Sequence, residues 1–349
     1  MKRTIIYSIF VCTLFISACS TELDVIGNYK ETLVVYGLLD IAQDTQYIKI
    51  NKAFLGAGNA YEYALIKDST QFKNALDVKI KCVTSGVTYT LTPANYIPKD
   101  PGLFYSPDQT NVIYKMVTDG SFGHPKLDGN SEYDLTVTNG ETGTTVTSKT
   151  DIVSDITGFL SPYPPAGSSF TFVIGIPTAN YKFRADWNTA KNAREYQVTM
   201  RLNYIDSTLT GNVTKFLDYI MPEHRTDNLG GGQTMSEEFY GKDYYKYIAN
   251  QLPSYSGLVE RRVVNVQLML VSGSDQFTTF LDVNKPSTGI IQERPEYTNI
   301  TNGLGIFSSR VNRVPVTRIL DNTSWDSLAC GQYTHASKFT NHLGLHPCL

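Results

Sequence analysis

The sequence predicts a mostly β protein in which two β-rich domains follow one another. Three observations carry this prediction. Short apolar or alternating segments recur between turn residues along most of the chain. Tyrosine is abundant, with 23 residues against 2 tryptophans, and aromatic residues of this kind favour strands. A Pro-rich stretch at 161–167 divides the series, because consecutive prolines cannot continue a sheet, and 349 residues suffice for two cores.

Residues 30–153 are expected to form an immunoglobulin-like β-sandwich. Residues 33–39 are a continuous apolar run, which is typical of a strand buried on both faces. Residues 46–52 alternate between polar and apolar, as do most of residues 76–92. Further strands are expected at 112–117, 133–137 and 144–148. Several short strands separated by turn signals are typical of such a sandwich.

One segment of this domain, 56–72, shows no clean alternation and is long for a loop. Long ordered loops are often functional, so we interpret the segment as part of a candidate binding region. The alternative is a decorated sheet edge that contains one helical turn.

Residues 154–169 are expected to form a Pro-rich linker, and 170–349 a second, fibronectin type III-like β-rich domain with one or two helices and a C-terminal tail. Alternating segments predict its strands at 181–187, 195–202, 214–221, 259–271 and near 311–320. A Trp near the end of the first strand and a Tyr opening the second resemble the start of a fibronectin type III sandwich.

Two helices are predicted within this second domain. The first covers about 236–252, where Thr234 and Glu237 fit a capping box and Pro253 ends the helix. Its aromatic residues fall on one broad face, which we interpret as a core-facing stripe. The second helix is shorter and covers 274–283, and the end of the chain is expected to be irregular.

The first 18 residues are predicted to be a lipoprotein signal peptide. Lys2 and Arg3 precede an apolar run of about a dozen residues, whereas a bilayer-spanning helix needs roughly 20. An aliphatic residue and two small residues then precede Cys19, which is the pattern of a bacterial lipoprotein cleavage site. Cleavage leaves Cys19 to carry acyl chains such as palmitate, with 19–29 as a lipidated tether. The alternative is an ordinary signal peptide with an incidental cysteine.

Charge and motifs exclude several functions. The chain has 30 basic and 33 acidic residues, and nucleic-acid binding requires concentrated positive charge, so no nucleic-acid partner is expected. The sequence contains no Gly-x-Ser-x-Gly, His-Glu-x-x-His or Walker motif. We therefore expect no catalytic residues and no cofactor.

The cysteines and histidines near the carboxyl end allow two interpretations. Cys330 and Cys348 flank a short loop, and an oxidising compartment favours a disulfide between them. His342 and His346 are four residues apart, which would place both on one helical face as zinc ligands. We prefer the disulfide and expect no metal. Cys82 alternates with charged residues and is interpreted as an inert core residue.

Four features together resemble a family of Bacteroidota outer-membrane lipoproteins with a domain of unknown function. They are the lipidation motif at Cys19, the segment 33–37, the strand pair at 187–196, and the Asn-Gly-Leu-Gly-Ile-Phe segment within 299–307. Acidic residues soon after Cys19 also resemble a surface-export signal. The resemblance implies an accessory lipoprotein of TonB-dependent transporters, and it supplies no catalytic residues.

We therefore expect a non-enzymatic outer-membrane lipoprotein that is exposed at the cell surface. Its partners would be the lipid bilayer, through Cys19, and a β-barrel outer-membrane protein, with a role in ligand capture or complex assembly. Exposed aromatic residues anchor interfaces, and those in and around the irregular segment are the expected contacts: Tyr36, Tyr47, Phe54, Tyr61 and Tyr63. The alternative is an autonomous adhesin that binds a glycan or a host protein.

Overall fold

The computed structural model describes residues 31–53, 59–94, 97, 112–156, 182–285 and 296–345. The predicted signal peptide, Cys19, the tether and most of the linker lie outside these ranges. The described residues are mainly strands whose sheets have a sandwich-like arrangement, which confirms the predicted fold class.

The strands form one eleven-stranded sheet, with the order β10-β9-β12-β13-β1-β2-β5-β4-β3-β6-β7, and one two-stranded sheet, β11-β8. The first seven strands are β1 (Leu33–Asp40), β2 (Thr45–Lys52), β3 (Asp77–Cys82), β4 (Thr88–Pro93), β5 (Ile113–Val117), β6 (Glu132–Thr138) and β7 (Thr145–Asp151). The others are β8 (Lys182–Asn188), β9 (Ala193–Thr208), β10 (Gly211–Arg225), β11 (Thr234–Tyr240), β12 (Leu258–Ser274) and β13 (Leu304–Arg318). The helices are α2 (Ala60–Leu65), α3 (Lys67–Thr70), α4 (Gly241–Gln251), α5 (Asp275–Asn284), α6 (Asn322–Cys330) and the 3₁₀ turn η1 (His335–Ser337).

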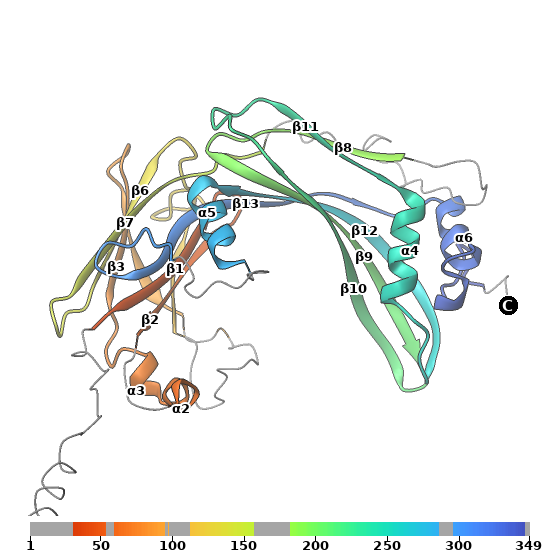
Figure 1. Cartoon of the computed structure of the whole chain (residues 1–349), viewed down its shortest axis with the longest axis horizontal. Helices are drawn as coiled ribbons and strands as arrows, with labels where there is room; N and C mark the ends of the chain where they lie inside the picture. The colour runs from red at the N-terminus through yellow and green to blue at the C-terminus, as the bar shows by residue number, and fades with distance from the viewer. Residues whose placement is uncertain are drawn as a thin grey trace, which may run out of the picture.

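The strands β1 to β7 fold over into a sandwich, on the left of Figure 1. β4 pairs with β5 on one side and with β3 on the other, so the large sheet turns at this strand. β7 lies beside β13, with a bridge between Thr147 and Thr301. Alternating apolar side chains such as Val35, Ile80 and Leu135 fill the interior. The strict alternation of burial in β3 and β6 agrees with the predicted pattern.

β1 corrects one prediction from the sequence. The apolar run 33–39 predicts a strand buried on both faces, but only one of its faces is fully buried. Leu33 and Val35 have no exposed surface, whereas Tyr36, on the opposite face, is 45 % exposed. The run is apolar enough for either arrangement, so its composition did not reveal that one face borders an open cavity.

Residues 302–305 form the turn that leads into β13. Asn302 and Gly305 have positive φ angles of 62° and 102°. A Cβ atom on Gly305 would lie 2.0 Å from the carbonyl oxygen of Val35, so glycine alone permits β13 to approach β1 here. The two strands then run parallel up to the pair of Asp40 with Arg310.

The long strands β9, β10 and β12, with the second part of β13, form an arched sheet. They pair in antiparallel register, and one face carries a second core that includes Trp187, Tyr196 and Leu268. The β8–β11 pair, α4 and α6 contribute side chains to this core, and Figure 1 shows both helices on the side away from the sandwich. β13 therefore contributes to both the sandwich and the arched sheet.

The predicted start of the first long helix is wrong. Residues 234–240 form β11, which pairs with β8 along its whole length. The Thr234 hydroxyl donates a hydrogen bond to Asn188 Oδ1 (3.2 Å) across this pair, and so does not cap a helix. The helix α4 begins only at Gly241, and its preceding residue, Tyr240, makes no side-chain cap.

The second predicted helix is confirmed, because α5 begins after Ser274, whose hydroxyl caps it. The predicted irregular tail is corrected, since α6 forms there. Asp321 caps α6 by accepting a hydrogen bond from the Ser324 backbone N–H (2.7 Å). An Asp at this position is a standard N-cap signal that the sequence interpretation missed.

Candidate functional site

A cavity of about 550 Å³ lies on the outer face of the sandwich, between α5 and the strands β1, β2 and β13. We call it the aromatic cavity. Its aromatic lining consists of Tyr36, Tyr47, Phe277 and Phe280, and its polar lining includes Asp40, Gln43, Gln46, Arg310 and Asn312. This volume is within the range of about 300–1,000 Å³ that is usual for small-molecule sites.

The floor of the aromatic cavity follows from strand alternation. Successive side chains of a strand point to opposite faces, so Tyr36 points outward while Val35 and Gly37 face the core. In the parallel pair, Tyr36 lies beside Ile306 of β13. Tyr47 of β2 lies on the same outer face and is 41 % exposed. Two large rings with accessible surface therefore border one concavity.

The wall of the aromatic cavity is α5. Phe277 and Phe280 lie one turn apart on this helix, and both line the cavity. The Phe280 and Tyr36 rings meet edge to face, with centroids 6.4 Å apart, which fixes how the tyrosine presents its ring. The start of the helix is attached to β13, because the hydroxyl oxygens of Ser274 and Ser308 are 2.6 Å apart.

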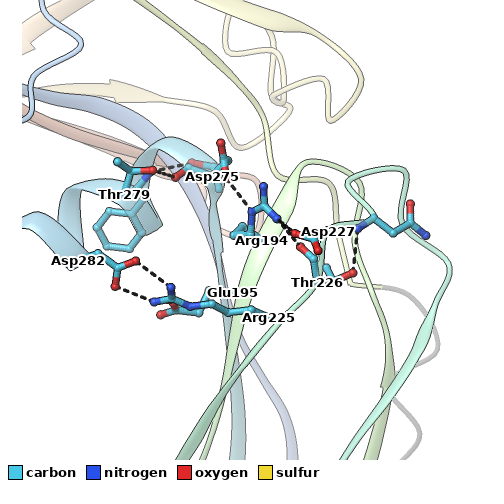
Figure 2. Close-up of polar contacts among 11 residues, drawn as sticks. Arg194, Glu195, Arg225, Thr226, Asp227, Asp275, Thr279 and Asp282 are labelled. Carbon is cyan, nitrogen blue, oxygen red and sulfur yellow. Dashed lines mark hydrogen bonds and ion pairs between the residues drawn. The ribbon is translucent and has the colours of Figure 1, made fainter.

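A group of ion pairs attaches α5 to the arched sheet (Figure 2). Arg225 donates two hydrogen bonds to Asp282, from Nη1 to Oδ2 (2.8 Å) and from Nη2 to Oδ1 (2.7 Å). Arg225 Nη2 also lies 2.6 Å from the Glu195 carboxylate. Arg194 donates from Nε to Asp275 Oδ1 (2.7 Å). We call these five residues the α5 clasp.

The α5 clasp consists of two groups of ion pairs, one around Arg225 and one around Arg194, and grouped charges hold side chains better than isolated surface pairs do. The fork of the Arg225 guanidinium matches the Asp282 carboxylate in a bidentate pair. This hydrogen bonding to Arg225 lowers the pKa of Asp282 to about 2. Since Asp275 and Asp282 lie at opposite ends of α5, the clasp fixes the whole helix and hence the cavity wall.

At the polar end of the cavity, Asp40 and Gln46 hold the β1–β2 turn. Asp40 Oδ1 accepts a hydrogen bond from the Ala42 backbone N–H (2.9 Å), and Oδ2 accepts one from the Asn312 backbone N–H (3.1 Å). Burial raises the pKa of Asp40, although these hydrogen bonds act in the opposite direction. Gln46 donates to the Asp40 carbonyl oxygen (2.9 Å) and accepts from its N–H (2.8 Å). Both side chains therefore stabilise the turn.

The structure brings together two of the five aromatic residues predicted as contacts. Tyr36 and Tyr47 line the aromatic cavity. Tyr63, in α2, is partly buried and lines neither this cavity nor the smaller one of about 290 Å³ beside α3. Phe54 and the side chain of Tyr61 lie outside the described residues. The described part of the segment 56–72 contains two helices, α2 and α3, where the alternative expected one helical turn, and residues 67–72 border the smaller cavity.

The sequence interpretation missed the residues that other segments bring to the cavity. Phe277 and Phe280 are three residues apart in a helix that was predicted, so their shared face was visible in the sequence. No local pattern indicated that this helix would lie against β1. Arg310 and Asn312 follow the turn at 302–305, and only the parallel pairing with β1 places them beside Asp40.

Of the two histidines in the zinc alternative, only His342 lies within the described residues. His342 lies in a turn after η1, with its Nδ1 2.7 Å from Asp326 Oδ1, and His346 lies outside the described residues. No group of His, Cys, Asp or Glu within the described ranges is arranged to hold a metal ion. Cys330 is disulfide-bonded, while Cys348 is not described, so their pairing stays a prediction. Cys82 is free and buried, as expected.

The protein is therefore mostly β, and its candidate site is a cavity between one face of a sheet and the helix α5, which the α5 clasp holds in place. Neither a protein-family model nor a curated protein sequence matches this chain. Within the described part of the chain, no helix combines the length and the apolar character that crossing a bilayer requires.

Proposed function

We propose that this protein is a non-enzymatic lipoprotein of the outer membrane, anchored through Cys19 and exposed at the cell surface. In this proposal it is an accessory subunit of a β-barrel transporter or another envelope complex, and it captures ligand for that complex. The observation that carries the proposal is the aromatic cavity, in which Tyr36 and Tyr47 are both exposed. These two residues were chosen as contacts from the sequence alone.

The construction of the cavity supports binding. Binding sites need side chains held in place by a rigid support. The floor consists of paired strands, and the wall is a helix fixed by Ser274 at its start and by the α5 clasp along its length. Exposed Tyr rings contribute large contact areas at low entropic cost. A ligand or partner would therefore meet a site that is already formed.

The lining also supports a binding role over catalysis. The buried carboxylate among the described lining residues belongs to Asp40, and both of its oxygens accept hydrogen bonds from backbone N–H groups. These bonds tie the carboxylate to the turn, so it has a structural role. General acid–base catalysis requires a group that is free to exchange a proton with a substrate.

The predicted lipid anchor limits how far from the membrane the cavity would lie. A fully extended tether over residues 19–29 spans at most about 35–40 Å, at roughly 3.3–3.6 Å per residue. The sandwich would therefore stay close to the membrane surface, within reach of the extracellular loops of a barrel. This geometry suits an accessory subunit that handles ligand next to a transporter.

The test is site-specific photo-crosslinking combined with affinity purification from gently solubilised outer membranes of the source organism. A photoreactive amino acid replaces Tyr47, and a matched variant carries it at Phe122, which is fully exposed but outside the cavity. We expect a β-barrel protein to co-purify and to crosslink at position 47 but not at position 122. A Cys19→Ala variant should lose both membrane attachment and the barrel. Recovery of the wild-type protein alone at low salt would contradict the proposal.

A further inference from the structure

Arg310 is the unsatisfied donor of the aromatic cavity. It lies in β13 in register with Asp40, and its side chain is exposed to the cavity. Its backbone is paired within the sheet, but its side chain makes no hydrogen bond or ion pair with any described residue. By contrast, Arg194 and Arg225 nearby each hold carboxylates. A guanidinium on a rigid strand is preorganised to bind a carboxylate through two parallel hydrogen bonds.

Asp40 does not occupy Arg310. The Asp40 side chain is only 3 % exposed, and its two oxygens already accept the backbone N–H groups of Ala42 and Asn312. Arg310 acts on Asp40 only through longer-range attraction. The charged groups of the lining are therefore a buried, engaged carboxylate and an exposed, unengaged guanidinium. The second of these remains available for an anion.

Asn312 lines the same cavity but does not offer its amide oxygen to a ligand. Its Oδ1 atom has no hydrogen-bond partner among the described residues, but this atom is buried, so a ligand in the cavity would not reach it. The polar group that the lining presents to a ligand is therefore the Arg310 guanidinium, which requires an acceptor such as a carboxylate.

The aromatic lining adds a second requirement. Tyr36 and Tyr47 offer ring surface to the cavity, and Phe280 holds Tyr36 by an edge-to-face contact. Flat aromatic surfaces pack well against the apolar C–H face of a sugar ring. Among compounds that carry a carboxylate, an acidic sugar has such a face.

The position of the cavity disfavours an extended peptide. Peptides that bind to sheets usually add a strand to a free edge, where unpaired N–H and C=O groups await them. β1 lies between β13 and β2, and β2 lies between β1 and β5, so the cavity floor has no free edge. Recognition here must therefore come from side chains, such as the aromatic rings and the guanidinium.

We propose that the aromatic cavity binds an acidic sugar, with Arg310 holding its carboxylate and with Tyr36 and Tyr47 packing against the ring. This inference rests on the proposed role in ligand capture and names the chemical class of the ligand.

The test is calorimetric titration of the purified mature chain with three pairs of oligosaccharides. The acidic members contain galacturonic acid, glucuronic acid or sialic acid, and each is matched by a neutral oligosaccharide of the same length. We expect at least one acidic member to bind about tenfold more tightly than its neutral match, with a difference that shrinks as sodium chloride is raised. Arg310→Gln should remove this difference, because it removes only the charged contact.

Two controls make the result specific. Arg262→Gln removes an exposed arginine of β12 outside the cavity and should leave the acidic preference unchanged. Tyr47→Ala should weaken acidic and neutral members by the same factor, because ring packing does not depend on charge. Thermal melting of all three variants checks that they fold, and Arg310 should be replaceable without loss because it has no described partner.

The inference is overturned if no acidic member is preferred, or if Arg310→Gln binds as tightly as the wild type. Binding of a carboxylate-bearing peptide without any sugar binding would also overturn it. Failure here is distinct from failure of the accessory role. A barrel that still crosslinks at position 47 would leave the accessory role standing without this ligand, and sugar binding without a barrel would leave an autonomous sugar-binding protein.

Discussion

The sandwich and the arched sheet build their cores in different ways. The sandwich uses strands of five to eight residues, and apolar side chains from its opposing faces fill its interior. The arched sheet uses strands of 15 to 17 residues with one face covered by β8–β11 and helices. It also encloses charge, because Asp206 and Arg261 are almost completely buried. The two regions should therefore respond to different kinds of substitution.

Arg261 shows how the arched sheet uses polar groups. Its Nε donates to Asp206 Oδ1 (2.9 Å), and its Nη1 donates to the carbonyl oxygens of Leu252 (2.8 Å) and Ser337 (2.9 Å). One side chain thus joins the sheet, the end of α4 and the tail after α6. The sandwich holds its buried Asp40 carboxylate with backbone N–H groups and without a guanidinium, and it depends mainly on the close parallel pairing of β1 with β13.

The largest effect should come from Gly305→Ala, which breaks the sandwich. The added Cβ would overlap the Val35 carbonyl, and the φ angle of 102° strains any L-residue. We expect a loss of about 4 kcal/mol or more in the free energy of unfolding, measured by urea denaturation. Hydrogen exchange should rise in β1 and β2 while β9 and β12 stay protected.

The matched control for this substitution is Gly140→Ala. Gly140 is exposed, and a Cβ there would meet no atom within 4 Å, so stability should hardly change. Equal loss of protection in β9 and β12 of the Gly305 variant would show that the two regions unfold together and would remove the distinction drawn here.

A smaller but still large effect should come from Arg261→Leu, which breaks the arched sheet. It leaves Asp206 buried without its closest guanidinium, although Lys215 Nζ and the Tyr255 hydroxyl remain within 2.8 Å. Breaking a buried ion pair costs about 3–5 kcal/mol, and the remaining partners favour the lower end. Urea denaturation measures the loss.

Arg262→Leu, at the next and exposed position, should cost less than about 0.5 kcal/mol. Combining Arg261→Leu with Asp206→Leu should recover part of the loss, because no unpaired charge then remains. The double variant could instead lose as much stability as the two single variants together. The loss would then come from packing and not from unpaired charge, and the arched sheet would not depend on its buried ion pair.

The smallest effect should come from the α5 clasp, which joins the two regions. Arg225→Gln removes the bidentate pair with Asp282, and since both side chains are about 40 % exposed we expect a loss of only about 1 kcal/mol at pH 7. The pKa of Asp282 is lowered to about 2, below its ordinary value of about 4. The contribution is therefore complete above pH 4 and is lost as the pH falls towards 2.

Thermal melting of the wild type and the Arg225→Gln variant between pH 7 and pH 2 measures this dependence. The difference between the two should narrow below pH 4, and 1 M sodium chloride should narrow it at pH 7. A difference that persists unchanged at pH 2 would show that Arg225 acts through packing of its stem and not through its charge.

The sequence predicted the elements whose signals are local. Alternation located β3, β6, β9 and β12, and the Ser274 cap located α5. It failed at 234–240, where Thr234 and Glu237 offered a helix start but a partner strand some 50 residues earlier was available. Every residue of the segment is paired with a residue of β8, and this pairing with a distant strand outweighs the local capping signal.

The sequence predicted only the part of the candidate site whose residues are close together in the chain. Tyr36 and Tyr47 lie in neighbouring strands joined by a short turn, so their common face followed from alternation. Phe280 and Arg310 reach the cavity only through the docking of α5 and the parallel pairing of β13. No sequence pattern near Tyr36 indicates either contact, so the cavity itself was not predicted.

The pairing of β1 with β13 has a consequence for the timing of folding. β1 pairs on one edge with β2, the next strand in the chain, but its other edge must wait for β13, which is made after β9, β10 and β12. Contacts between residues so distant in the chain form slowly, because a long loop must close first. The hairpins of both regions can form earlier from neighbouring segments. The second edge of the strand closest to the predicted membrane anchor would thus be completed only after nearly all of the chain has emerged.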